Sequence, residues 1–122
     1  VGHSLKFEDE TYGLINSRPS QFGDFVLARK DVPTSYHLSA TIDDAFQGIT
    51  LVTRGEDLLP VTHIHRLLQE LLDLPVPRYQ HHKLIADEVG NRLSKRTGPA
   101  TLKAMRQTGK TPRDVIAMLD SM

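Results

Sequence analysis

The sequence predicts an α/β protein, because short runs of strand-forming residues alternate with one amphipathic helix. Apolar runs at residues 25–28 and 49–53 precede a helical pattern at about 61–72, and another apolar run lies at 83–86. Strand–helix–strand order is typical of α/β domains built on a parallel sheet. We therefore expect half of a parallel-sheet domain, followed by a small helical segment.

The predicted strands are short and differ in character. Residues 49–53 are β-branched and apolar, which favours a central strand. Residues 25–28 are also apolar and are expected to form a buried strand, and residues 36–38 are expected to be extended. Residues 42–46 predict one helical turn, which Gly48 ends.

The strongest helical pattern runs from about residue 61 to 72, where apolar side chains recur on one face. Thr62 is placed to cap the start of this helix. Residues 100–107 predict a short helix, and Thr111 followed by Pro112 predicts the start of another. The buried face of that last helix is expected to consist of Val115, Ile116 and Leu119.

The composition is that of a globular protein, since 25% of the 122 residues are charged and 39% are hydrophobic. No apolar run approaches the roughly 18 residues that a membrane-spanning helix needs, and the N-terminus lacks the apolar core of a signal peptide. The sequence contains no cysteine, which excludes disulfides and thiolate metal sites. We expect a cytoplasmic protein with no membrane partner.

Three parts are expected along the chain. Residues 1–23 are poorly specified, residues 24–86 form the half domain, and residues 87–122 form a loop and a helical segment. Residues 1–90 carry eight basic and thirteen acidic side chains, a net charge of −5, whereas residues 91–122 carry seven and two, a net charge of +5. A basic face of this kind suits polyanions. Because a half sheet leaves an unpaired edge, we also expect self-association or a loosely ordered N-terminal part.

A five-residue loop at the start of the basic segment is suited to binding phosphate. It consists of Arg92, Leu93, Ser94, Lys95 and Arg96. Lysine supplies a mobile positive charge, serine a hydroxyl group, and arginine a planar fork of donors. A pattern this short also fits a solvated turn with ordinary surface charge.

This loop resembles the KMSKS signature of class I aminoacyl-tRNA synthetases, in the form that the glutamate-specific members use. Four blocks upstream resemble the second half of the glutamyl-tRNA synthetase catalytic domain, in the same order and at similar spacing. They lie at residues 33–38, 42–50, 54–59 and 77–82, and the segment at 24–31 is most similar to the glutamyl-Q-tRNA(Asp) synthetases. The resemblance implies the C-terminal half of a Rossmann-like catalytic fold, followed by the start of a stem-contact region.

The same resemblance implies a set of site residues. Tyr36 and Arg54 match the positions at which the family holds glutamate, and Lys95 matches the lysine that stabilises charge on the phosphates of ATP. ATP is thereby implied as a substrate, with Mg²⁺ accompanying it. The other loop residues, Arg92, Leu93, Ser94 and Arg96, are implied to shape the loop. From the residues alone, Tyr36 also fits a packed aromatic side chain and Arg54 a strand-end surface charge.

The histidine spacing does not predict a metal site. His63 and His65 are two positions apart on a predicted helix, so they point in different directions. His81 and His82 are adjacent, so on a strand they would lie on opposite faces. We therefore expect no metal site, and no zinc site in particular.

These features together predict a ligase that activates glutamate with ATP and transfers it to tRNA, with the queuosine of tRNA(Asp) as the implied acceptor. The HIGH signature of the family does not occur in the sequence, and neither does a Gly-rich phosphate loop, so the isolated chain is expected to be inactive. Two alternatives stay open. One is a part of an ordinary glutamyl-tRNA synthetase, and the other is a non-catalytic remnant that binds RNA or nucleotide through its basic segment.

Overall fold

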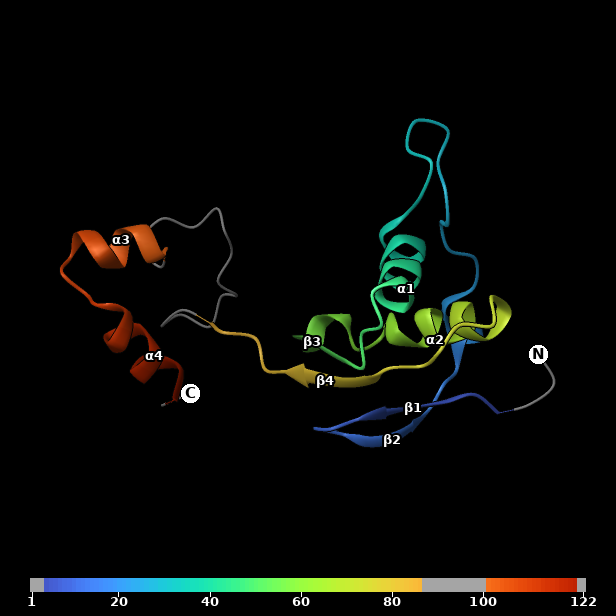
Figure 1. Ribbon diagram of the computed structural model, residues 1–122, viewed down its shortest axis with the longest axis horizontal. Coiled ribbons are helices and arrows are strands. Elements are labelled where there is room, and N and C mark those ends of the chain that lie inside the picture. Colours follow the sequence, from blue (N-terminus) through green and yellow to red (C-terminus); the bar gives the residue numbers. More distant parts are fainter. Residues whose placement is uncertain (1–3, 87–100, 121–122) are drawn as a thin grey trace. The chain divides into compact units, whose positions relative to one another are not determined.

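The computed structural model describes residues 4–86 and 101–120 of the chain (Figure 1). The chain divides into two compact units, Val1–Lys83 and Leu84–Met122. The first unit contains a sheet with helices, and the second contains two short helices. Within the described ranges, no helix has the length and apolar character needed to cross a membrane.

A four-stranded mixed sheet forms the base of the first unit. Its strands are β1 (Lys6–Asp9), β2 (Gly13–Asn16), β3 (Leu51–Gly55) and β4 (Arg78–His82), in the order β2-β1-β4-β3. β1 and β2 pair antiparallel, whereas β4 runs parallel to both of its neighbours. The expected α/β class is confirmed, although the sheet is not purely parallel.

The inner strands bury alternate side chains, as the pleat of a sheet requires. In β1 the buried positions are Phe7 and Asp9, and in β4 they are Tyr79 and His81. The interior of this unit is therefore partly polar, and its polar side chains need partners there.

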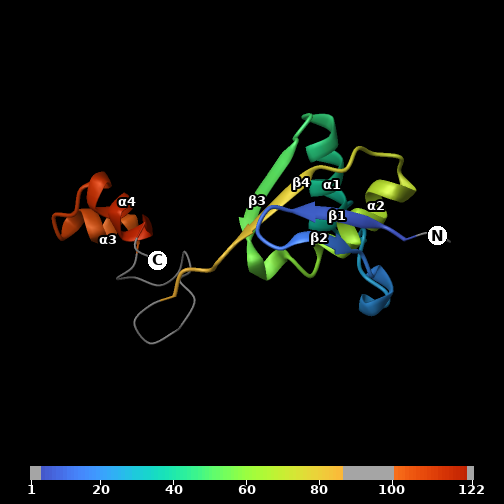
Figure 2. The same cartoon turned by 90° about the horizontal axis from the view of Figure 1, so that it is seen from below.

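Two helices, α1 (Tyr36–Phe46) and α2 (Thr62–Leu71), lie on one face of this sheet (Figures 1 and 2). Ser35 caps α1, since its hydroxyl accepts a hydrogen bond from the Leu38 amide at 3.4 Å. The side-chain amide of Gln69 in α2 donates to the hydroxyl of Tyr79 at 2.9 Å, which ties this helix to β4. Two short 3-10 helices, η1 (Pro19–Phe22) and η2 (Glu56–Leu58), complete the unit.

The predicted strand at residues 25–28 is wrong, because this segment is a largely exposed loop. The loop closes on itself through its backbone. The Arg29 amide donates to the Val32 carbonyl at 2.9 Å, and the Ser35 amide donates to the Leu27 carbonyl at 2.7 Å. Since these hydrogen bonds satisfy the loop locally, its backbone does not need a partner strand in the sheet.

Two other extended segments are also predicted wrongly. Residues 36–38 open α1, because Ser35 provides a helix cap directly before them. Residues 83–86 do not form a strand, and β4 lies immediately before them. The buried positions of β4 are an aromatic residue and a histidine, so an apolar run does not mark this strand in the sequence.

The N-terminal segment has more structure than the sequence analysis expects. Residues 1–23 supply both strands of the antiparallel pair, β1 and β2. Leu5 and Phe7 are only 4% and 2% exposed, so this segment contributes to the core. The alternation that marks β1 spans very few residues, which makes it a weak signal in the sequence.

The second unit consists of α3 (Leu102–Gln107) and α4 (Pro112–Asp120), which confirms the two predicted helices. The Thr111 cap is also confirmed: the Asp114 amide donates to its hydroxyl at 3.2 Å, and the Thr111 amide donates back to the Asp114 carboxylate at 2.8 Å. The predicted buried face of α4 is wrong, since Ile116 is 59% exposed and Leu119 is 49% exposed. Two short helices are too few to enclose an apolar face.

Candidate functional site

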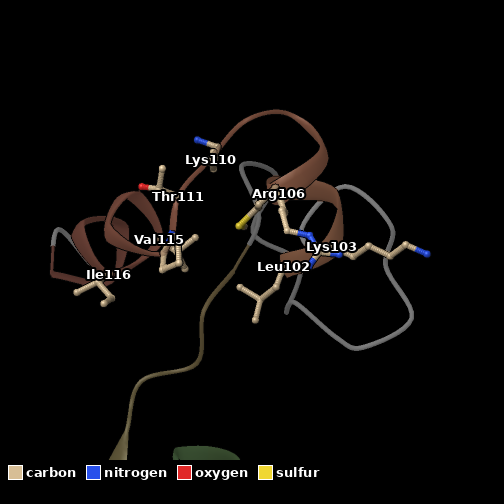
Figure 3. Close-up of a pocket in the computed structure, with 9 residues that line it drawn as sticks. Leu102, Lys103, Arg106, Lys110, Thr111, Val115 and Ile116 are labelled. Atoms are coloured by element: carbon tan, nitrogen blue, oxygen red, sulfur yellow. The ribbon is translucent and has the colours of Figure 1, made fainter.

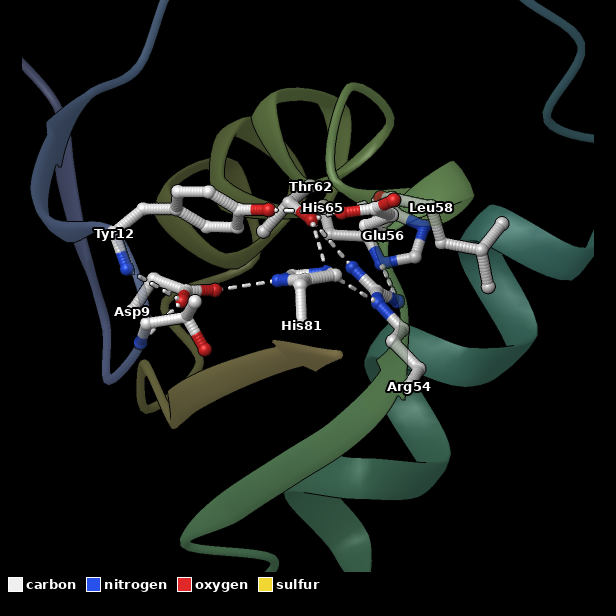
Figure 4. Close-up of polar contacts among 9 residues, drawn as sticks. Asp9, Tyr12, Arg54, Glu56, Leu58, Thr62, His65 and His81 are labelled. Carbon is white, nitrogen blue, oxygen red and sulfur yellow. Dashed lines mark hydrogen bonds and ion pairs between the residues drawn. The ribbon is translucent and has the colours of Figure 1, made fainter. Parts of the chain in front are cut away.

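The candidate site lies where β3 and β4 run side by side. Arg54 of β3 and His81 of β4 are register partners, so their side chains are neighbours on one face of the sheet. The Nε atom of Arg54 donates a hydrogen bond to Nε2 of His81 at 3.0 Å (Figure 4). Arg54 lies within β3 and not just past its end, which corrects the position expected from the sequence.

Asp9 of β1 holds the other nitrogen of the His81 ring. Nδ1 of His81 donates to Oδ2 of Asp9 at 2.5 Å, and both side chains are completely buried. Since Nε2 accepts from Arg54, the proton of this ring is on Nδ1 and the ring is neutral. Burial lowers the pKa of His81, which favours the same neutral form.

The Asp9 carboxylate is itself well supported. Its Oδ1 atom accepts hydrogen bonds from the amides of Thr11 and Tyr12 at 2.8 and 3.1 Å. Burial alone would raise the pKa of Asp9, but the hydrogen bonds from His81 and from these two amides outweigh burial and hold the pKa below its usual value. Asp9 is therefore a carboxylate at neutral pH, and it fixes the orientation of His81.

Two residues of α2 bind the rest of the Arg54 guanidinium group. Its Nη2 atom donates to the hydroxyl of Thr62 at 2.6 Å, and its Nη1 atom lies 3.3 Å from Nδ1 of His65. The guanidinium carbon lies 5.2 Å from the centre of the Tyr79 ring, within the range of a cation–π contact. Each of the three guanidinium nitrogens thus has a neutral acceptor, and one face of the group lies over an aromatic ring.

Thr62 has a different role from the one expected. It does not cap α2, because Val61 holds the cap position and makes no side-chain cap bond. The Thr62 hydroxyl donates to the Leu58 carbonyl at 3.0 Å while it accepts from Arg54. Its side chain is fully buried. This hydroxyl also lies 3.2 Å from Nε2 of His81, whose Nδ1 binds Asp9. Because the hydroxyl is inaccessible to a substrate, the three residues do not form a nucleophilic triad.

His65 connects Arg54 to a second histidine. Its Nε2 atom lies 3.0 Å from Nδ1 of His37 in α1. An arginine is only a donor, so Nδ1 of His65 is the acceptor and its Nε2 donates to His37. Burial, followed by the charge of Arg54, lowers the pKa of His65 to about 3. This ring is therefore neutral at physiological pH, like that of His81.

The structure brings Tyr36 and Arg54 together, on two sides of His65. The rings of Tyr36 and His65 have centres 5.7 Å apart, and His65 in turn contacts Arg54. Tyr36 opens α1 and is 53% exposed, so its side chain is accessible from solvent. The two predicted glutamate contacts therefore come from α1 and β3 and share His65 as a neighbour.

The other predicted site residues lie outside the described residues. These are the five residues of the predicted KMSKS-type loop: Arg92, Leu93, Ser94, Lys95 and Arg96. Their assignment stays a prediction from the sequence.

Most of the residues around Arg54 are not recognisable from the sequence. Asp9 carries no known motif, and the spacing of His65 and His81 in the sequence bears only on metal binding. His81 and His82 lie on opposite faces of β4, as their adjacent positions predict, since His81 is buried and His82 is exposed. In the part of the chain that the structure describes, no group of three or more His, Asp or Glu side chains is placed to hold a metal ion.

A separate hollow of about 470 Å³ lies between α3 and α4 of the second unit (Figure 3). Apolar side chains form its wall, and three basic side chains, Lys103, Arg106 and Lys110, accompany them. It is open to solvent and contains none of the residues around Arg54. Its lining residues are Leu102, Lys103, Met105, Arg106, Lys110, Thr111, Pro112, Val115 and Ile116.

The chain belongs to the family of class I tRNA synthetases, catalytic domain for Glu and Gln, whose model matches residues 2–122. Among its relatives, a glutamyl-Q tRNA(Asp) synthetase from Rhodobacter capsulatus is 56% identical over 93 residues, which are 76% of this chain and 34% of that protein. A glutamate–tRNA ligase from Methylococcus capsulatus is 41% identical over 115 residues, which are 94% of this chain and 25% of that protein. The family resemblance found in the sequence is confirmed.

Solved structures give the same result for the fold. A glutamate–tRNA synthetase from Elizabethkingia anophelis superimposes with a TM-score of 0.65 at 28% identity, covering 90% of this chain and 21% of that one. A glutamate tRNA ligase from Elizabethkingia meningosepticum, solved in complex with its amino acid, gives a TM-score of 0.66 at 29% identity. The chain spans about a third or less of the relatives named here.

The neutral histidines make the stability of this unit sensitive to acid. Below pH 6.5 the unfolded chain binds a proton at His65 that the folded chain excludes until pH about 3. The free energy of unfolding should therefore fall as the pH drops through this window, by up to about 1.4 kcal/mol per pH unit for this residue. The variant His65→Asn should show a shallower slope between pH 6.5 and 4.5, measured by urea unfolding. Gln80→Ala, at an exposed position of β4 without a titratable group, should keep the original slope. An unchanged slope in His65→Asn would contradict the assignment.

Proposed function

We propose that the chain serves an aminoacyl-tRNA synthetase that activates glutamate with ATP and transfers it to tRNA. The observation that carries the proposal is the Arg54 guanidinium group, held by neutral acceptors next to the accessible side chain of Tyr36. In open α/β sheets, ligands bind beyond the carboxyl ends of parallel strands, and Arg54 is the penultimate residue of β3. The relatives, which are named as glutamate-specific, support the same choice of amino acid.

Arg54 is suited to bind a carboxylate of glutamate. A guanidinium group has five N–H donors, and in this site each of its three nitrogens donates one hydrogen bond to the protein. Nη1 and Nη2 each keep a second N–H for which the described residues provide no acceptor, so two donors remain for a ligand. Two donors on a planar group match the two oxygens of a carboxylate. Tyr36, which contacts His65 as Arg54 does, would orient the rest of the amino acid.

The implied role of Lys95 concerns ATP and rests on the sequence alone. As glutamate attacks the α-phosphorus, negative charge increases on the phosphate oxygens, and a positioned lysine stabilises it. Mg²⁺ would accompany ATP through the phosphates, since this ion is commonly bound by few carboxylates together with substrate phosphates.

Replacement of Arg54 by lysine tests the carboxylate contact. The variant keeps a positive charge but loses the planar fork, so it should not behave as a conservative change. In the complete synthetase, meaning this chain with the remaining length that its relatives carry, Arg54→Lys should raise the KM for glutamate about tenfold or more, with the KM for ATP unchanged. Steady-state pyrophosphate exchange measures both constants. An unchanged KM for glutamate would remove Arg54 from the site.

Replacement of Lys95 by alanine tests whether this lysine stabilises the phosphates of ATP or is a solvated turn residue. In the complete synthetase, Lys95→Ala should lower the rate of adenylate formation by about 10²–10³, the usual scale for the loss of one such donor. Affinity for glutamate should hardly change, because the proposed contacts lie at Tyr36 and Arg54. Rapid-quench measurement gives the rate. A rate within about twofold of the unmutated enzyme would leave only the solvated-turn interpretation.

The tRNA that receives glutamate distinguishes a glutamyl-Q tRNA(Asp) synthetase from a glutamate–tRNA ligase. The higher identity to a glutamyl-Q tRNA(Asp) synthetase favours tRNA(Asp), whereas the solved structures are of glutamate–tRNA synthetases. We expect the complete synthetase to attach radioactive glutamate to tRNA(Asp) that contains queuosine. The same tRNA without queuosine serves as the control and should remain uncharged. Efficient charging of tRNA(Glu) would instead assign the chain to the ordinary glutamate–tRNA ligases.

A further inference from the structure

Arg54 is held in an unusual way for a cation on the inner side of a sheet. Its three nitrogens donate to His81, His65 and Thr62, which are all uncharged acceptors. Among the described residues, no carboxylate forms an ion pair with Arg54. A carboxylate partner would both cancel the charge and occupy the donors that bind in pairs. Neutral acceptors fix the group while its positive charge stays available.

The acceptors of Arg54 depend on protons that other residues place. His81 can accept from Arg54 only when its proton is on Nδ1, and Asp9 secures that arrangement from a strand 72 positions away in the sequence. If the proton moved to Nε2, two N–H donors would face each other and the contact would be lost. Asp9 thus influences Arg54 without touching it.

His65 also accepts a hydrogen bond from Arg54 only because its proton is held on the other ring nitrogen. Its Nδ1 atom accepts from Arg54 and its Nε2 donates to His37. The ring also contacts Tyr36, at a distance of 5.7 Å between centres. His65 therefore contacts both of the residues proposed to hold glutamate.

The charged and titratable groups that face Arg54 come from all four surrounding elements. In the sheet, β4 contributes His81 and Tyr79, and β1 contributes Asp9 through His81. Of the helices, α2 contributes His65, and α1 contributes His37 and Asp44. The titratable groups that form hydrogen bonds with the guanidinium nitrogens are the neutral imidazoles of His81 and His65. Asp44 acts on Arg54 only through its charge, without an ion pair, and the hydrogen bonds to neutral acceptors orient the arginine.

We propose that Asp9, His81 and His65 are positioning residues that hold the Arg54 guanidinium group in the orientation in which its two remaining N–H donors bind a carboxylate. The inference rests on the proposed function, in which that carboxylate belongs to glutamate. An arginine side chain has several freely rotating bonds, and fixing them in advance lowers the entropy lost when the ligand binds.

A pair of variants at His65 tests this role in the complete synthetase. His65→Leu fills the buried space without an acceptor, whereas His65→Asn keeps a side-chain oxygen near the position of Nδ1. We expect His65→Leu to raise the KM for glutamate about tenfold or more, since a hydrogen bond to a charged group is lost. We expect His65→Asn to recover most of that loss. The KM for ATP should stay constant in both variants.

Asp9→Asn and a control on α2 complete the series. Asparagine can support the wrong tautomer of His81, so Asp9→Asn should also raise the KM for glutamate about tenfold. His63 faces another direction and accepts from the Arg18 amide at 2.9 Å. His63→Leu should therefore leave both constants unchanged. If His65→Leu and His65→Asn behave alike, or if the KM for ATP rises in parallel, the residues are merely structural and the proposal is wrong.

A measurement without variants or substrate separates this proposal from the proposed function. Nitrogen NMR of the histidine rings should show His81 with its proton on Nδ1 and His65 with its proton on Nε2, at neutral pH. The opposite tautomer at either ring would overturn the positioning role. If the tautomers are as expected but Arg54→Lys leaves glutamate binding unchanged, Arg54 does not bind glutamate. The positioning of Arg54 by the histidines would still stand.

Discussion

The hydrogen bond from Arg54 to His81 is the contact on which the rest of the first unit depends. It joins β3 to β4, and the other side of His81 joins β4 to Asp9 of β1. The same guanidinium group joins the sheet to α2 through Thr62. Buried polar groups cost free energy unless they are paired, so each member of this network requires the others. The hydrogen-bond network that stabilises the first unit therefore also fixes the position of the Arg54 guanidinium group.

This arrangement combines two demands that normally conflict. Enclosing an arginine favours a carboxylate partner, yet a partner of that kind would neutralise the charge and occupy paired donors of the guanidinium group. The unit places the carboxylate of Asp9 one residue further away, with a neutral histidine between the two charges. The Asp9 carboxylate then stabilises the network without occupying the N–H donors of Arg54. The consequence is that the histidines must stay unprotonated, which links the stability of the unit to pH.

The sequence predicts some of this site and not the rest, for identifiable reasons. α2 has a long apolar stripe and β3 is β-branched, so both are visible in the sequence. β4 buries Tyr79 and His81 instead of an apolar run, and its strand is consequently misplaced. Tyr36 and Arg54 are identified only through the family resemblance, and the expected extended segment at 36–38 is a helix. Asp9 and His81 are 72 residues apart, and only the register of a parallel pair brings them together.

The protein environment by itself favours arginine at position 54. Its three acceptors lie in the directions of a planar guanidinium group, with the Tyr79 ring on one face. A lysine ammonium carries three donors on a single nitrogen, and one nitrogen cannot reach acceptors placed around three. A lysine would leave at least one of the buried imidazole or hydroxyl groups without its partner, at a cost of about 1–3 kcal/mol for each such group. The acceptors behind Arg54 therefore require the planar side chain independently of any ligand, and a substitution at this position would also have to alter the residues that accept its hydrogen bonds.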